Sequence, residues 1–180
     1  YEEITRGGDL DEAFAGVDAA LKAGLTPLKL NVVAIEGFND DEILNFVQLS
    51  INHPINIRFI ELMPVGRTGL NSNYRYLSCG EIKKRLPSLI PLDRQEGVAE
   101  LYRYPEALGN IGFISPMSKL FCGSCDKIRL TGEGKLQPCL HSDEEIDLNG
   151  ILRTGDDDLL KETIRNAVLR KGEKHHLNDG

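Results

Sequence analysis

Three of the four cysteines in this 180-residue chain lie close together, with a spacing that suits metal ligation. Two residues separate Cys122 from Cys125, and Cys139 follows after a Thr-Gly-Glu-Gly segment that predicts a hairpin. Clustered cysteines in a chain without an export signal bind metal more often than they form disulfides. Three thiolates leave one iron of a [4Fe–4S] cluster open to a further ligand. An iron–sulfur cluster on these residues is therefore one interpretation.

His141 supports a second interpretation, in which the same cysteines bind zinc. A structural zinc site has four protein ligands, and Cys122, Cys125, Cys139 and His141 complete a Cys₃His set. The spacing alone supports iron–sulfur and zinc about equally. The zinc interpretation makes the protein an interaction module without catalysis. Cys79 lies apart from the group, and we expect it to be a structural thiol.

Two cations follow the Cys-x-x-Cys turn and favour the iron–sulfur interpretation. Residues two apart on a strand point to the same face, so Lys127 and Arg129 are expected to lie together beside the metal. A structural zinc does not need such cations, whereas an anionic ligand next to a reactive iron does. A solvated strand face is the simpler alternative, and these two residues alone favour it.

The elements that position these residues begin as alternating helices and strands. Helical periodicity predicts helices over residues 9–23 and 43–51, the second starting at a capping box of Asn39 and Glu42. Apolar runs predict strands over residues 28–35 and 55–63. Such alternation is typical of an α/β fold with parallel strands, and the helix at the start implies a further strand upstream.

The pattern changes after residue 66. Residues 67–77 are expected to form a loop, Ser78 to cap a short helix and Asp156 to cap the last one. Short strands are predicted at residues 101–104, 110–115, 127–130 and 135–140. The second part of the chain is thus expected to be mixed α+β.

Composition excludes several classes of function. The chain is 41% hydrophobic and has a formal net charge of −7, which suits a globular protein and not a general nucleic-acid binder. No apolar run could span a membrane and no export signal opens the chain, so we expect a cytoplasmic location. Tyr1 is not a start methionine, and we expect the chain to be a fragment.

Specific segments of the chain carry a family resemblance. They are residues 121–131, 134–136, 139–140, 3–8, 28–31, 37–42 and 58–64. These segments resemble the C-terminal portion of the GTP 3',8-cyclase family and follow one another along the chain in the same order as in that family. The family consists of radical S-adenosylmethionine enzymes of molybdenum cofactor biosynthesis. The cysteine segment and the Phe-Ile-Glu-Leu-Met-Pro segment at 59–64 are the specific ones.

The resemblance implies a fold and a reaction. The family has an incomplete TIM-type (β/α) barrel and two [4Fe–4S] clusters, of which the first cleaves S-adenosylmethionine to a 5'-deoxyadenosyl radical. The radical attacks GTP, which the second cluster binds through its open iron. By resemblance, residues 1–66 are the remainder of the barrel, and residues 67–180 form the C-terminal cluster and GTP-binding region.

Site residues follow from the same resemblance. It makes Cys122, Cys125 and Cys139 the cluster ligands, Met63 a contact of S-adenosylmethionine, and Lys29, Lys127, Ile128 and Arg129 contacts of GTP. Lys29 and Met63 lie on successive predicted strands, and barrel active sites lie at strand ends. Without the resemblance, Lys29 is better explained as a snorkelling lysine and Met63 as core filling.

The chain departs from the family in three respects. It lacks the Cys-x₃-Cys-x₂-Cys motif of the first cluster, so the chain alone is expected to be inactive. Lys127 replaces a usual arginine and loses its bidentate fork. Asn178-Asp179-Gly180 stands where the family ends in Gly-Gly. The expected partners are GTP, cyclic pyranopterin synthase as the next enzyme and a second copy of the chain, with no nucleic acid and no membrane.

Overall fold

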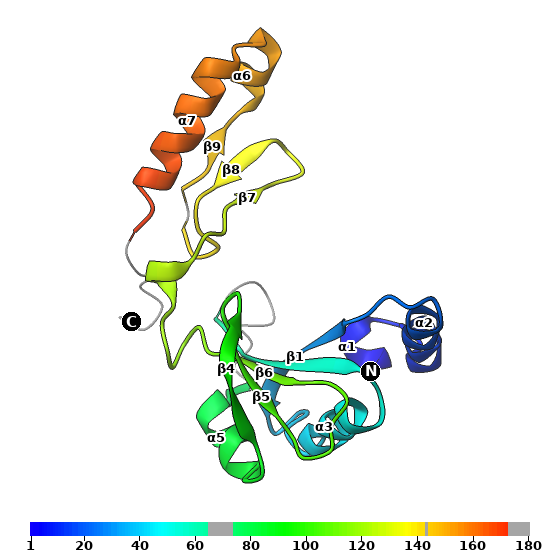
Figure 1. The fold of residues 1–180 in the computed structure, drawn as a ribbon. Coiled ribbons are helices and arrows are strands. Elements are labelled where there is room, and N and C mark those ends of the chain that lie inside the picture. Colours follow the sequence, from blue (N-terminus) through cyan, green and yellow to red (C-terminus); the bar gives the residue numbers. More distant parts are fainter. Residues whose placement is uncertain (65–73, 143, 173–180) are drawn as a thin grey trace. The chain divides into compact units, whose positions relative to one another are not determined.

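The computed structural model describes residues 1–64, 74–142 and 144–172 (Figure 1). They form two compact units: a sheet unit of Tyr1–Leu62 and Ser72–Ser115, and a cysteine unit of Met63–Asn71 and Pro116–Gly180. Of the described residues, 1–62 and 74–115 thus belong to the sheet unit, and the expected domain boundary after residue 66 stays a prediction. Most of the predicted 67–77 loop lies outside the described residues.

The sheet unit combines short helices with a six-stranded sheet. The helices are α1 (Glu2–Thr5), α2 (Leu10–Lys22), α3 (Ile43–Asn52) and α5 (Cys79–Arg85). The strands are β1 (Leu28–Glu36), β2 (Ile55–Glu61), β3 (Arg75–Tyr76), β4 (Ile90–Glu96), β5 (Ala99–Arg103) and β6 (Ile111–Ile114). Asp9 caps α2, and Ser78 with Glu81 forms a capping box on α5.

The sheet has the strand order β3-β1-β2-β6-β5-β4. Strands β1, β2 and β6 are mutually parallel, while β3, β4 and β5 run antiparallel to their neighbours. The predicted α/β class is therefore confirmed, with antiparallel strands added at both edges. On the β3 side, no strand within the described ranges pairs with β1 before Ile35.

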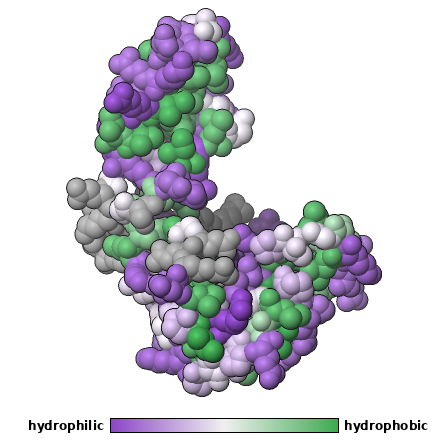
Figure 2. All heavy atoms as spheres, viewed as in Figure 1, coloured by the Kyte–Doolittle hydropathy of each residue, from purple (hydrophilic) through white to green (hydrophobic). Residues whose placement is uncertain are grey.

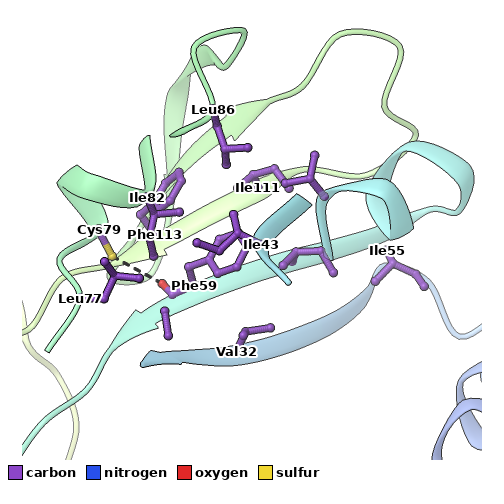
Figure 3. Packing of buried hydrophobic residues seen from close by; sticks show 13 residues of the cluster. Val32, Ile43, Ile55, Phe59, Leu77, Cys79, Ile82, Leu86, Ile111 and Phe113 are labelled. Carbon is purple, nitrogen blue, oxygen red and sulfur yellow. Dashed lines mark hydrogen bonds between the residues drawn. The ribbon is translucent and has the colours of Figure 1, made fainter. Parts of the chain in front are cut away.

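One face of this sheet carries the main hydrophobic core (Figure 3). Phe59 and Phe113 lie opposite each other in register, and their rings stack with centroids 5.9 Å apart. Ile43 of α3 and Ile82 of α5 belong to the same core cluster, so both helices pack on this face. Burying one such apolar side chain stabilises the fold by roughly 1.5–3 kcal/mol. This core fixes β1 and β2, which carry the predicted sheet residues.

The start of α3 differs from the prediction. The helix begins at Ile43 with Glu42 as its N-cap, and Asn39 does not cap it. The side chain of Asn39 instead accepts a hydrogen bond from the N–H of Ile35 and donates one to the carbonyl of Val33. Asn39 thus closes the turn against β1, because an asparagine side chain can bond to the backbone of a preceding strand as well as to a helix.

The cysteine unit has a small sheet covered by one helix. Its elements are the 3₁₀ turn η1 (Cys122–Ser124), the strands β7 (Arg129–Leu130), β8 (Lys135–Gln137) and β9 (Ile146–Asp147), and the helices α6 (Asn149–Thr154) and α7 (Asp157–Leu169). The strands form an antiparallel sheet in the order β7-β8-β9. Leu136, Leu148 and Ala167 join this sheet to α7. The predicted hairpin is confirmed, in a shorter form.

Hydrophobic side chains also reach the surface of both units, between hydrophilic ones (Figure 2). Leu10 and Phe14 of α2 are exposed, as are Leu159, Val168 and Leu169 of α7. Among the described residues, no helix combines the length and the apolar character needed to cross a membrane.

Candidate metal centre

Cys122 and Cys125 lie at the two ends of one tight turn. The N–H of Cys125 donates to the carbonyl of Cys122 at 3.1 Å and closes η1. Cys139 follows β8, beyond the buried Pro138. All three cysteines are half-buried and none forms a disulfide. The unit therefore presents three free thiols on short connections between its secondary-structure elements.

Two of these sulfur atoms accept hydrogen bonds from nitrogen. The backbone N–H of His141 lies 3.5 Å from Sγ of Cys139, and the ammonium of Lys171 lies 3.4 Å from Sγ of Cys125. Hydrogen bonds from N–H donors to ligand sulfur are a feature of iron–sulfur sites. The chemistry of this donor set fits an iron–sulfur cluster.

The ligands are not gathered around a single ion. Within the described residues, no three His, Cys, Asp or Glu side chains form a group that could hold a metal ion. The Cys₃His zinc set is accordingly not assembled either. His141 contacts Cys139 through its backbone N–H.

The cations after the turn are exposed and only partly on a strand. Strand β7 begins at Arg129, so Lys127 and Ile128 lie in the preceding loop. The expectation that Lys127 and Arg129 share a strand face is therefore wrong. The ammonium of Lys127 lies 2.6 Å from Oδ1 of Asp126. This hydrogen-bonded pair lowers the pKa of Asp126 and raises the pKa of Lys127.

Lys29 lies at the beginning of β1 and not at its carboxyl end. It is exposed and stands opposite Asn56 in the parallel register with β2. Met63 is half-buried and follows the last residue of β2, Glu61, by two positions. Barrel active sites lie at the carboxyl ends of strands, so the expectation that Lys29 lies at such a strand end is wrong.

Sequence reasoning missed Arg58, which the register places on the same sheet face as Lys29. Lys29 and Asn31 are exposed and alternate with the half-buried Leu28 and Leu30 on β1, and Arg58 stands opposite Asn31 on β2. Gly112 of β6 stands opposite Arg58, and a Cβ there would lie 3.1 Å from Cγ of Arg58. The glycine leaves room for the arginine. A positive charge in an otherwise largely apolar strand was the signal that could have found Arg58.

Glu61 and Cys79 are buried beneath this part of the sheet, each 1% exposed. A carboxylate oxygen of Glu61 accepts the N–H of Cys79 at 3.0 Å, which anchors the start of α5. Sγ of Cys79 lies 3.5 Å from the carbonyl oxygen of Ile114. Burial raises the pKa of the Cys79 thiol to about 11. Cys79 is therefore a core thiol, as expected.

Comparison with known proteins identifies relatives for the whole chain. The family model described as Molybdenum Cofactor Synthesis C matches residues 55–177. Proteins named GTP 3',8-cyclase from Alkaliphilus oremlandii and Alkaliphilus metalliredigens are 46% and 47% identical over 98% of this chain. A protein of the same name from Moorella thermoacetica is 46% identical over the full chain. The chain spans 55–57% of the length of these relatives.

Proposed function

We propose that this chain, which belongs to the Molybdenum Cofactor Synthesis C family, is the part of a GTP 3',8-cyclase that binds a [4Fe–4S] cluster and GTP. The observation that carries the proposal is the set of three free, half-buried thiols in one compact unit. The names of the relatives support it. In the complete protein a second cluster, on residues outside this chain, would cleave S-adenosylmethionine, and Met63 would contact that cofactor.

Cys122, Cys125 and Cys139 would hold the cluster, which supplies an open iron able to bind the guanine of GTP. The turn at η1 holds two of the thiols two residues apart. The hydrogen bonds to Cys125 and Cys139 would orient these two ligands. His141 contributes a backbone donor in this scheme and not a metal ligand.

The cations would bind the triphosphate. In the cysteine unit we assign this role to Lys127 and Arg129, with Ile128 between them. In the sheet unit we assign it to Lys29 and to Arg58, on one sheet face. The net charge of −7 provides no general attraction for GTP, so the affinity must come from these few side chains. Binding of GTP would require Lys127 to exchange its contact with Asp126 for a phosphate.

Within the described residues, no strand pairs with the outer edge of β1 before Ile35, which supports the proposal of an incomplete barrel. Strands β1, β2 and β6 are parallel, as barrel strands are, and β3 covers β1 only at Ile35 and Glu36. Val33 and the α2 residues Leu10 and Phe14 are exposed on this part of the unit. Strands from the remaining part of the complete protein would pair along β1 and cover them. The product would then pass to cyclic pyranopterin synthase in the cytoplasm.

Metal analysis after anaerobic purification tests this function. The proposal expects iron and acid-labile sulfide in equal amounts, and a brown colour that air removes. Changing Cys122, Cys125 or Cys139 to Ala should greatly reduce the iron content, while the matched control Cys79→Ala should not. Bound zinc without sulfide would support the interaction module instead. A His141→Ala variant as empty as the cysteine variants would contradict the open-iron assignment.

A further inference from the structure

Lys171 directs its whole ammonium group at the turn that carries the first two cysteines. Its Nζ lies 3.0 Å from the carbonyl oxygen of Cys125, 2.9 Å from that of Lys127 and 3.4 Å from Sγ of Cys125. A lysine ammonium has three N–H donors, and these three contacts use all of them. The contacts join residues more than forty positions apart in the sequence.

The helix that precedes Lys171, α7, packs on the small sheet of the cysteine unit. Ala167 of α7 is fully buried against Leu136 and Leu148 of the small sheet. The backbone N–H of Lys171 donates to the carbonyl of Val168, which continues the helical path beyond the last residue of α7. The packing of α7 and this hydrogen bond therefore hold the backbone of Lys171 in the cysteine unit.

We propose that Lys171 is a positioning residue of the metal centre that fixes residues 125–127 and sets the reduction potential of the cluster. The proposal rests on the proposed function, in which Cys125 is a cluster ligand. Hydrogen bonds to ligand sulfur and nearby charges tune iron–sulfur potentials, and residues around the ligands orient them. Reduction adds negative charge, so a cation at the sulfur stabilises the reduced form.

The neighbouring cation does not serve the same purpose. Lys127 lies within 2.6 Å of Asp126, an exposed carboxylate, and the two form a solvent-facing pair. Lys171 is half-buried and contacts two backbone carbonyls together with the sulfur. Its two carbonyl contacts define the turn even before a metal centre binds. Two roles follow, one for the metal-free turn and one for the loaded cluster.

The test compares three variants of the chain. Lys171→Met removes the charge and the donors, Lys171→Arg keeps the charge, and Lys161→Met is the matched control. Lys161 lies on α7, the helix that precedes Lys171. Its side chain is exposed and contacts Asp158 of the same helix. After anaerobic loading with iron and sulfide, the midpoint potential is measured by a redox titration followed by electron paramagnetic resonance.

A charge-assisted hydrogen bond changes an equilibrium by about tenfold or more. We therefore expect the ratio of reduced to oxidised cluster at a fixed potential to fall about tenfold in Lys171→Met, which lowers the one-electron midpoint by about 59 mV. Lys171→Arg should recover most of the difference, and Lys161→Met should match the parent. Equal potentials for Lys171→Met and Lys161→Met in loaded proteins would overturn the proposed tuning.

Hydrogen exchange on the metal-free chain tests the positioning role separately. Amides of residues 125–128 should exchange faster in Lys171→Met than in Lys161→Met, because the two carbonyl contacts are lost. Unchanged exchange would overturn the positioning role. A parent chain that takes up no iron would instead count against the proposed function, so the two failures are distinguishable.

Discussion

The buried thiol of Cys79 should make the stability of the chain fall in alkaline solution. The side chain is 1% exposed, and burial raises its pKa from 9.0 to about 11, with the nearby carboxylate of Glu61 adding to the increase. The folded state thus favours the neutral thiol. Its contribution to the free energy of unfolding is fully present below pH 9 and is lost as the pH rises through about 11.

The size of this effect follows from the change in pKa. A rise from 9.0 to about 11 corresponds to about 2–3 kcal/mol between the two limits, since each pKa unit is worth 1.36 kcal/mol. By pH 10, about 1.4 kcal/mol of this should already be lost, whereas at pH 8 the loss is about 0.1 kcal/mol or less.

Urea unfolding of the metal-free, reduced parent protein and of its Cys79→Ala variant measures the stability that is lost when the Cys79 thiol ionises. The substitution lowers stability at both pH values because it leaves a small cavity, but the variant has no thiol to ionise. The stability difference between the two proteins should therefore shrink by about 1.3 kcal/mol from pH 8 to pH 10. Lys83, whose pKa is also raised, is present in both proteins and cancels. An equal difference at both pH values would refute the reasoning.

Three further predictions concern the cations and the last helix. Arg129→Ala should weaken GTP binding to the cluster-loaded protein by about tenfold or more, while Lys127→Arg should maintain or tighten it; equal calorimetric affinities for parent and Arg129→Ala would mean that the arginine faces solvent. Gly112→Ala crowds Arg58 and should weaken GTP binding in the same direction as Arg58→Ala but less; an effect on stability alone would remove Arg58 from the site. Asp156→Ala removes the hydrogen bond that caps α7 and should lower the free energy of unfolding by about 1 kcal/mol; the exposed Asp157→Ala is its control, and equal unfolding midpoints would show that the cap contributes nothing.

Local features of the sequence were predicted well because their causes are local. The α2 helix ends within a residue of its prediction, since apolar periodicity and the Asp9 cap act over one or two turns. Ser78 caps α5 as expected, because its Glu81 partner is three residues away. The same reasoning failed at Asn39, where the backbone of β1 competes for the side chain.

Long-range pairings could not be predicted in this way. Strand β6 pairs with β2 across about fifty residues, and nothing in its own four residues specifies that partner. The contact of Lys171 with the cysteine turn likewise depends on the packing of α7 onto the small sheet. The type and spacing of the cysteines pointed to metal, but the register of β1 and β2 was needed to find Arg58 beside Lys29.

The two faces of the sheet differ in polarity, and this difference bears on whether the α/β fold is doubly wound or a barrel. In a doubly wound fold, helices cover both faces, and the central strands are apolar along their whole length. Strand β1 does not fit that pattern, because Lys29 and Asn31 are exposed and alternate with Leu28, Leu30 and Val32, which pack with the core. Asn56 and Arg58 of β2 continue the polar face in register. A central strand with a polar second face suits a barrel whose interior holds a charged ligand, since an unpaired charge under a helix would be costly. The alternation of Lys29 and Asn31 with apolar residues is therefore what the proposed incomplete barrel predicts for β1.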